Sequence, residues 1–226
     1  MTVVAVMQPY FIPYLGYFRL FQAADIFVAL DCVQFPRRGL VHRNRLSDEV
    51  GRLRYLTLPL KRTPRATRID ELHFREDSKA DLMAQMRKFP ALRGEWRDAE
   101  LGDWLTGFDR RVVDYLVAGL RLFSRRLGVE RPVYRSSELK LPDRLRGQER
   151  ILAIVRAFGG DAYVNAPGGR QLYDANAFRQ CGINLGFLKP FDGGIVSICE
   201  RIGLEDRSCL MNELARTTEV DWTEQT

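Results

Sequence analysis

The sequence predicts an α/β fold in which a mostly parallel sheet is flanked by helices and carries a helical insertion. Short apolar runs rich in β-branched residues alternate with segments of helical spacing near both ends of the chain. The chain has 226 residues, 46% of them hydrophobic, which is enough to bury one large core. We therefore expect a single α/β domain over residues 1–216, with the insertion at residues 77–127.

The first unit of this fold is a strand, a helix and a second strand. Residues 3–7 are a buried apolar run, residues 13–24 have helical spacing with a proline in the first turn, and residues 26–30 are a second apolar run. Such a unit is usually parallel with a right-handed crossover. Ligands bind beyond the carboxyl ends of such strands, so residues 8–13 and 31–38 are expected at one edge of the sheet.

The rest of the chain continues the alternation. The further predicted elements are a strand at residues 53–58, helices at 77–89 and 104–127, a strand at 132–135, a helix at 147–158, a strand at 162–164, a helix at 174–180 and a strand at 183–187. Apolar density falls after Leu214, and residues 217–226 are therefore expected to be a mobile acidic tail.

The positive charge of the chain is concentrated in one segment. Residues 37–68 contain ten basic and two acidic side chains, a net charge of +8, whereas the whole chain carries +6. Arginine offers forked donors to phosphate oxygens and stays charged at physiological pH. Without a helix-turn-helix, zinc-finger or RRM signature, DNA is not an expected partner, and a phosphate-bearing small molecule fits better. The alternative is an ordinary solvated basic surface.

Several classes of protein are excluded by missing patterns. The four cysteines (32, 181, 199 and 209) lack zinc-ligand spacing, so we expect free thiols in a reducing cytoplasm and no metal site. The first residues lack a basic region ahead of a long apolar stretch, and no apolar run is long enough to span a membrane, so neither secretion nor membrane insertion is expected. The absence of Gly-x-Ser-x-Gly, Walker and Gly-x-Gly-x-x-Gly motifs argues against an esterase, a P-loop kinase and a Rossmann dehydrogenase.

The segment after the first predicted strand is rigid and aromatic. Residues 8–18 contain two prolines, a glycine and five aromatic residues, and they precede a helix N-terminus that could bind an anion. A glycine there would let a ligand approach closely. The binding candidates are Gln8, Tyr10, Gly16 and Tyr17, with Tyr14 as a catalytic candidate. The alternative is an aromatic cluster that fills the top of the core.

The segment after the second predicted strand combines a carboxylate with cations. Asp31 could accept a proton from an amine or bind a ribose hydroxyl, and Gln34, Arg37 and Arg38 could bind the phosphate. An ordinary loop carboxylate paired with Arg37 explains the pattern equally well. Cys32 could be a nucleophile activated by the arginines, although a small inert thiol is the commoner case.

Two further groups of candidates lie elsewhere in the chain. His42, one of only two histidines, is the candidate acid or base, with a hydrogen-bonded loop residue as the alternative. Residues 165–173 form a second candidate ligand loop, and the alternative is a tight turn. Two hydroxyl side chains follow the predicted strand at residues 132–135, and the alternative for them is a helix cap. These candidates are Gly168, Gly169, Arg170 and Tyr173 in the loop, and Ser136 and Ser137 after the strand.

The residues from Met7 to Phe18, the Asp31-x-Val33-Gln34 segment and the triplet Arg43-Asn44-Arg45 together resemble the WbqC-like family. The resemblance continues through Pro167-Gly-Gly-Arg-x-Leu-Tyr173 and covers most of the chain. It implies a cytoplasmic protein of a bacterial surface-polysaccharide (O-antigen) or natural-product pathway, acting on a nucleotide-linked sugar or a related small amine. The positions that match the family are Gln8, Tyr10, Tyr14, Asp31, Gln34, Arg43, Asn44 and Arg45. The family's C-terminal Leu-Ser-Ile-Ile-Asp pattern is degraded here to residues 207–211.

A second resemblance concerns Tyr14-Leu-Gly16-Tyr17, which stands where nucleotidylyltransferases carry His-x-Gly-His, after a first strand and at a helix start. Both imidazoles are replaced by phenols, which cannot supply the positive charge that stabilises a phosphoryl transition state. The similarity therefore implies a HUP-like, nucleotidylyltransferase-like fold more than adenylyl transfer.

The resemblance to the WbqC-like family implies a transferase of an acyl or aminoacyl group, and we expect Asp31 or His42 to accept the proton of the attacking amine. The expected donor is a nucleotide or an activated acyl or aminoacyl compound, with aminoacyl-tRNA as one option. A nucleotidylyltransferase and a non-catalytic ligand-binding protein of the same pathway are the alternatives.

Overall fold

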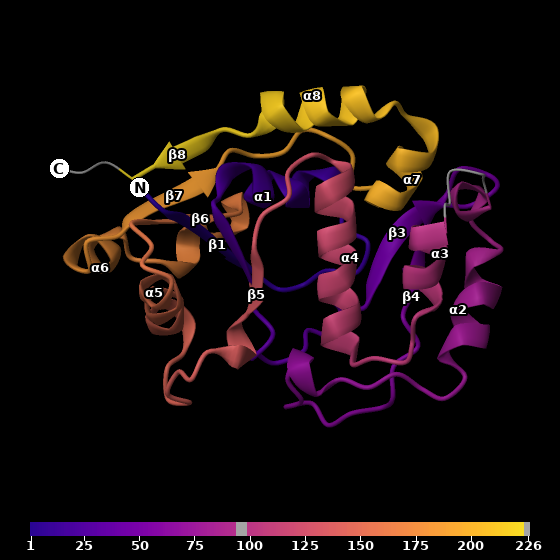
Figure 1. Cartoon of the computed structure of the whole chain (residues 1–226), viewed down its shortest axis with the longest axis horizontal. Coiled ribbons are helices and arrows are strands. Elements are labelled where there is room, and N and C mark those ends of the chain that lie inside the picture. Colours follow the sequence, from indigo (N-terminus) through magenta and orange to yellow (C-terminus); the bar gives the residue numbers. More distant parts are fainter. Residues whose placement is uncertain (94–98, 224–226) are drawn as a thin grey trace.

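The computed structural model describes residues 1–93 and 99–223, and its centre is a six-stranded sheet in the order β5-β2-β1-β6-β7-β8 (Figure 1). Five strands are parallel and β8 is antiparallel to β7. The strands are β1 (Val3–Met7), β2 (Ile26–Ala29), β5 (Val133–Arg135), β6 (Ala162–Asn165), β7 (Asn184–Leu188) and β8 (Val220–Trp222). The predicted α/β fold with a mostly parallel sheet is confirmed.

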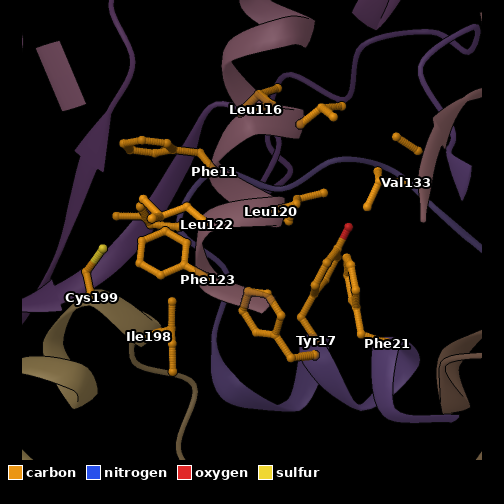
Figure 2. Close-up of a cluster of buried hydrophobic side chains, with 14 of the residues drawn as sticks. Phe11, Tyr17, Phe21, Leu116, Leu120, Leu122, Phe123, Val133, Ile198 and Cys199 are labelled. Atoms are coloured by element: carbon orange, nitrogen blue, oxygen red, sulfur yellow. The ribbon is translucent and has the colours of Figure 1, made fainter. Parts of the chain in front are cut away.

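Helices cover both faces of this sheet, because its central strands β1, β2 and β6 bury apolar residues on both of their sides. One face packs against α1 (Arg19–Ala23), α4 (Val112–Arg126) and α8 (Arg207–Thr217), and Figure 2 shows the aromatic cluster on this side. The other face packs against α5 (Gly147–Ala157) and α6 (Ala175–Gln180). Figure 1 shows these two sets of helices on opposite sides of the sheet.

A second, smaller layer lies beside the sheet, at the right of Figure 1. Strands β3 (Arg43–Ser47) and β4 (Leu53–Thr57) form an antiparallel hairpin that contacts α2 (Ser78–Met86). Helices α3 (Ala99–Thr106) and α7 (Ile198–Leu204) complete this layer. Five short 3-10 segments connect the elements: Leu15–Phe18, Ile69–Glu71, Pro90–Leu92, Ser136–Glu138 and Pro167–Leu172.

Several elements differ from the sequence predictions, and helices α7 and α8 were not predicted at all. The helix predicted at residues 104–127 is two helices, α3 and α4, separated around Gly107. The helix predicted at residues 13–24 is a 3-10 segment followed by the short α1. Strand β3 was not predicted, because only its second and fourth residues are buried and its other positions are polar or charged.

The C-terminal segment also differs from its prediction. Residues 217–226 were expected to form a mobile acidic tail, but Val220–Trp222 pair with β7 as the edge strand β8. Trp222 covers Gly186 of β7, where an added Cβ atom would lie 2.6 Å from the indole ring. Residues 224–226 of the predicted tail lie outside the described residues.

Candidate functional site

The strand order reverses at β1, whose neighbours β2 and β6 lie on its two sides. In open parallel sheets ligands bind beyond the carboxyl ends of the strands, near such a point. The segments that leave this edge begin with Gln8 after β1, Leu30 after β2, Ser136 after β5 and Ala166 after β6. Most of the predicted site residues therefore lie at one edge, but they form separate groups.

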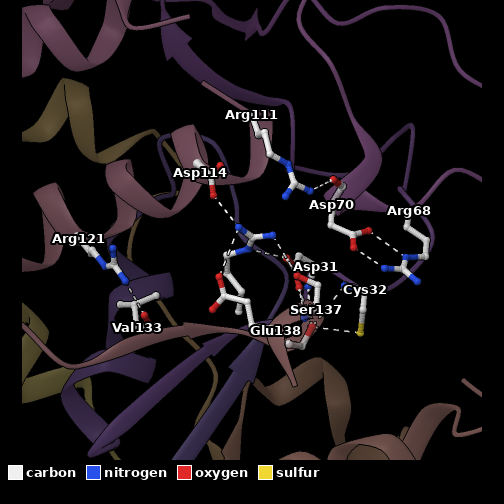
Figure 3. Close-up of polar contacts among 12 residues, drawn as sticks. Asp31, Cys32, Arg68, Asp70, Arg111, Asp114, Arg121, Val133, Ser137 and Glu138 are labelled. Atoms are coloured by element: carbon white, nitrogen blue, oxygen red, sulfur yellow. Dashed lines mark hydrogen bonds and ion pairs between the residues drawn. The ribbon is translucent and has the colours of Figure 1, made fainter. Parts of the chain in front are cut away.

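The first group surrounds Asp31, whose side chain is fully buried. Its carboxylate accepts four hydrogen bonds, from Ser136 Oγ at 2.9 Å, the Ser137 amide at 2.8 Å, Ser137 Oγ at 2.6 Å and Arg135 Nε at 3.0 Å (Figure 3). An ionised carboxylate has about four acceptor positions. All of these acceptor positions are used by the four donors. The geometry therefore gives Asp31 a role in positioning the loop after β2, and the two serines hold its carboxylate in place.

Arginines tie this buried group to its surroundings. Arg135 also bonds Asp114 through Nη1 at 2.7 Å. The thiol of Cys32 lies 3.1 Å from Ser136 Oγ and 3.1 Å from Arg150 Nη1. Figure 3 shows Asp31, Cys32 and Ser137 close to the paired side chains of Arg68 and Asp70. The carboxylate at the end of β2 therefore belongs to a connected polar network.

The aromatic segment after β1 is packed against itself. Tyr17 is buried and donates a hydrogen bond to the Gln8 carbonyl oxygen at 2.8 Å, and its ring lies 5.1 Å from that of Tyr10. The Tyr14 ring lies 5.9 Å from the Phe191 ring. An added Cβ atom at Gly16 would lie 2.5 Å from the Tyr14 ring, so Gly16 is required by close side-chain packing rather than by an open approach.

A strained residue in this segment is locked in place from two other elements. Ile12 has φ +38°, which a β-branched residue rarely adopts. Its carbonyl oxygen accepts hydrogen bonds from Asn44 Nδ2 at 2.9 Å and Ser197 Oγ at 2.8 Å. Asn44 is 1% exposed and also bonds the Phe11 carbonyl oxygen. The predicted binding residue Asn44 thus acts as a clamp on the aromatic segment.

Two of the predicted cations, Arg37 and Arg38, lie at two adjacent cavities. The larger one, here called the Arg65 cavity, has a volume of about 740 Å³ and is lined by Gln34, Phe35, Pro36, Arg37, Arg38 and Arg65. Its lining contains three guanidinium groups, and none of the described residues that line it is acidic. Two predicted binding residues of the loop after β2, Arg37 and Arg38, therefore lie at one cavity with Arg65, whereas no residue of the aromatic segment after β1 is among its described lining residues.

The smaller one, here called the Lys61 cavity, has a volume of about 370 Å³. Phe35 and Arg37 line it as well, so it shares a wall with the Arg65 cavity. Its charged lining residues are Arg37, Lys61, Arg62, Arg75 and Asp81, and the remaining lining residues include His42, Leu58, Pro59 and Gln85. Arg75 pairs with Asp81, which leaves Arg37, Lys61 and Arg62 as the excess positive charge.

The wall of both cavities is made by two loops that bond one another. Gln34 Nε2 donates to the Arg65 carbonyl oxygen at 2.7 Å, and the Phe35 amide donates to the Thr67 carbonyl oxygen at 2.9 Å. Arg37 donates to the Thr63 carbonyl oxygen. The loop after β2 and the loop after β4 are therefore held together mainly through backbone oxygens.

His42 lies at the Lys61 cavity in an unusual state. Burial and the neighbouring Arg43 lower the pKa of its imidazole to about 4, so the ring is uncharged at neutral pH. The Nδ1 atom is buried, and no hydrogen-bond partner for it occurs in the part of the chain that the structure describes. The ring meets Phe35 edge-on at 5.0 Å.

The other predicted cations lie away from the cavities. The guanidinium groups of Arg43 and Arg45 stack on the Tyr55 ring at 4.3 and 5.3 Å. Arg170 pairs with Asp221 of β8, and the Tyr173 hydroxyl lies 3.2 Å from that of Tyr163. Gly168 has open space around it, whereas Gly169 lies against the Asn165 side chain. Residues 165–173 thus form a separate group at the β6–β8 side.

Some residues of this site were not singled out from the sequence. Lys61, Arg62 and Arg65 belong to the basic segment, so the charge run was a usable signal for them. Arg135 directly precedes the two predicted serines, and its position at a strand end was also a signal. Nothing in the sequence indicates that Ser197 or Phe191 packs against the aromatic segment, because the contacts bridge more than 170 residues.

The geometry defines an α/β protein with a two-cavity basic cleft at the carboxyl edge of a parallel sheet. The family model of the WbqC-like protein family matches residues 8–192, and the chain belongs to this family. The uncharacterized protein Rv1507c of Mycobacterium tuberculosis (strain ATCC 25618 / H37Rv) is 27% identical over 207 residues, 85% of this chain and 84% of that protein. No solved structure matches the chain, so the likeness to HUP folds stays a prediction.

The described residues, 1–93 and 99–223, contain neither a helix that could span a membrane nor a group of side chains that could hold a metal ion. None of their helices combines the length and apolar character needed to cross a membrane. None of their His, Cys, Asp and Glu side chains form a group of three or more that could hold a metal ion.

Proposed function

We propose that the chain is a cytoplasmic transferase that moves an acyl or aminoacyl group to an amine of a phosphate-bearing metabolite, such as a nucleotide-linked amino sugar. The observation that carries the proposal is the Arg65 cavity, where Arg37, Arg38 and Arg65 converge on one space. Guanidinium groups in such a space favour phosphate through forked hydrogen bonds. Membership of the WbqC-like family supports a place in polysaccharide or natural-product biosynthesis.

In the proposed reaction the amine nitrogen attacks the carbonyl carbon of an activated acyl or aminoacyl donor, aminoacyl-tRNA being one such donor. The new C–N bond forms, the bond to the leaving group breaks, and the amine loses a proton. His42 is the proposed proton acceptor, because its imidazole lines the Lys61 cavity together with Arg37. Asp31 positions the loop that carries Gln34 to Arg38. Catalysis then rests mainly on holding two reactants together.

Mass spectrometry tests the proposal directly. The protein is incubated with a nucleotide-linked sugar that carries a free amine, together with acyl thioesters or aminoacyl-tRNA, and the sugar is analysed for acyl addition. We expect product from the wild type, about tenfold weaker sugar binding in Arg38→Ala, and a lower kcat with little change in binding in His42→Gln. Arg52→Ala, in the same basic segment but outside both cavities, is the control.

The second candidate is a non-catalytic ligand-binding protein, which the complete engagement of Asp31 by four donors favours. Sugar that binds but is recovered unchanged with every donor would contradict the transferase and support this candidate.

A further inference from the structure

The two basic cavities share a wall and yet have different cations. Phe35 and Arg37 line both of them. Arg38 and Arg65 line only the Arg65 cavity, whereas Lys61 and Arg62 line only the Lys61 cavity. The cations therefore fall into two sets, one in the lining of each cavity, and the Phe35 ring belongs to both linings.

These cations have no acid to neutralise them among the residues that the structure describes. No ion pair joins an acidic side chain to Arg37, Arg38, Lys61, Arg62 or Arg65. By contrast, Arg54, Arg68 and Arg75, which belong to or adjoin the same basic segment, each pair with an aspartate. Five like charges held together repel one another, which an anionic ligand would relieve.

The lining of the Lys61 cavity differs from that of the Arg65 cavity in its apolar part. Leu58, Pro59 and Leu60 contribute to it alongside the cations. Such a lining suits an uncharged body that carries a charged group. Phe35 and Arg37 belong to both linings, so a ligand with two anionic groups can place one group in each cavity.

We propose that the ligand of this cleft carries two anionic groups joined by an uncharged spacer, a phosphate in the Arg65 cavity and a second phosphate or carboxylate in the Lys61 cavity. The spacer passes Phe35, and Arg37 contacts both groups. This inference rests on the proposed function for its first subsite and adds the chemical class of the substrate.

Titration calorimetry with glucose 1-phosphate and glucose 1,6-bisphosphate tests the inference without a nucleotide. The wild type is expected to bind the bisphosphate at least about tenfold more tightly than the monophosphate. Lys61→Ala/Arg62→Ala and Arg38→Ala/Arg65→Ala are each expected to reduce the bisphosphate affinity to the level of the monophosphate. The double variant Arg52→Ala/Arg54→Ala removes the same charge outside the cavities and is expected to keep the difference.

A second comparison identifies the second anionic group. Glucuronic acid 1-phosphate differs from glucose 1-phosphate by one carboxylate, so tighter binding of the former, lost in Lys61→Ala/Arg62→Ala, supports a carboxylate in the Lys61 cavity.

Three results would overturn the inference. Equal affinity for the mono- and bisphosphate would overturn it while leaving the proposed function standing, whereas failure to bind either compound would count against both. Tighter binding of a short single-stranded RNA than of the bisphosphate would replace the small-molecule ligand by a nucleic acid.

Discussion

Asp31 shows how a polar residue at a strand end can be structural in a candidate active centre. Its carboxylate is buried and receives donors from a strand-end arginine and from two consecutive serines. A charge removed from such a network leaves its partners buried and unpaired, which costs more than the interaction itself contributes. Removing the charge of Asp31 is therefore expected to lower the stability of the folded protein strongly.

We expect Asp31→Asn to lower the free energy of unfolding by about 3–5 kcal/mol, because Arg135 loses its buried charged partner and the new amide meets hydroxyl donors. Urea denaturation followed by circular dichroism measures this change. Asp109→Asn, at a residue whose side chain is 82% exposed, is the matched control and should change stability by less than about 0.5 kcal/mol. An Asp31→Asn variant as stable as the wild type would show that the network does not hold the loop.

The stability of the folded protein is expected to depend on pH through His42, and the surroundings of the imidazole determine the direction of this dependence. Burial and Arg43 lower the pKa of the folded imidazole from 6.5 to about 4, so the unfolded chain binds the proton more readily. The contribution of His42 to stability is therefore full above pH 6.5 and is lost as the pH falls from 6.5 towards 4. Proton NMR of the imidazole resonances should show no titration of His42 between about pH 7 and 5.

His73→Gln assigns the two histidine signals and serves as the control for this measurement. His42→Gln is expected to lose less stability than the wild type between about pH 6.5 and 4. A midpoint for His42 between about pH 6 and 7 would contradict the buried, uncharged state.

At the scale of elements, the edge strand β8 depends on a glycine in its neighbour. Gly186 of β7 lies under Trp222 and Val220, where an added Cβ atom would meet side-chain atoms at 2.6 and 2.7 Å. Gly186→Ala is expected to destabilise the protein by about 1–3 kcal/mol and to raise amide hydrogen exchange in β8 before the central strands.

Gly168→Ala, at a position with no neighbour within 4 Å, is the control and should be nearly neutral. In a Trp222→Ala background the cost of Gly186→Ala should fall, because the two residues are in contact. Equal costs in both backgrounds would show that the indole is not what excludes the methyl group.

The elements that could be predicted from the sequence are those in which the order of apolar and polar residues within the element itself indicates a strand or a helix. The five parallel strands are runs or alternations of apolar side chains, so local periodicity was sufficient. Strand β3 alternates buried and half-buried positions, but arginine, asparagine and serine occupy four of its five positions. Strand β8 has an acid at its centre and pairs with β7 at the edge of the sheet. Both strands therefore depend on partners that a local pattern does not contain.

At the scale of the whole molecule, the sequence located the basic segment but not which of its residues line the two cavities. The charge run located the segment, because ten basic residues in 32 cannot all be neutralised by two acids nearby. The hairpin β3–β4 then turns Arg43 and Arg45 onto Tyr55, and it brings Lys61 to Arg65 back to the loop after β2. Which basic residues line the cavities and which stack on Tyr55 therefore depends on tertiary contacts between residues about 30 positions apart, such as the contact of Gln34 with the Arg65 backbone.

The way in which the two cavity loops are joined has a consequence for divergence among proteins of this architecture. Gln34, Phe35 and Arg37 bond the carbonyl oxygens of Arg65, Thr67 and Thr63, and every amino acid supplies such an oxygen. Replacing the side chains at positions 61 to 65 would therefore leave the loop junction intact while altering what the cleft attracts. A new selectivity could arise there by a few substitutions without any rebuilding of the scaffold.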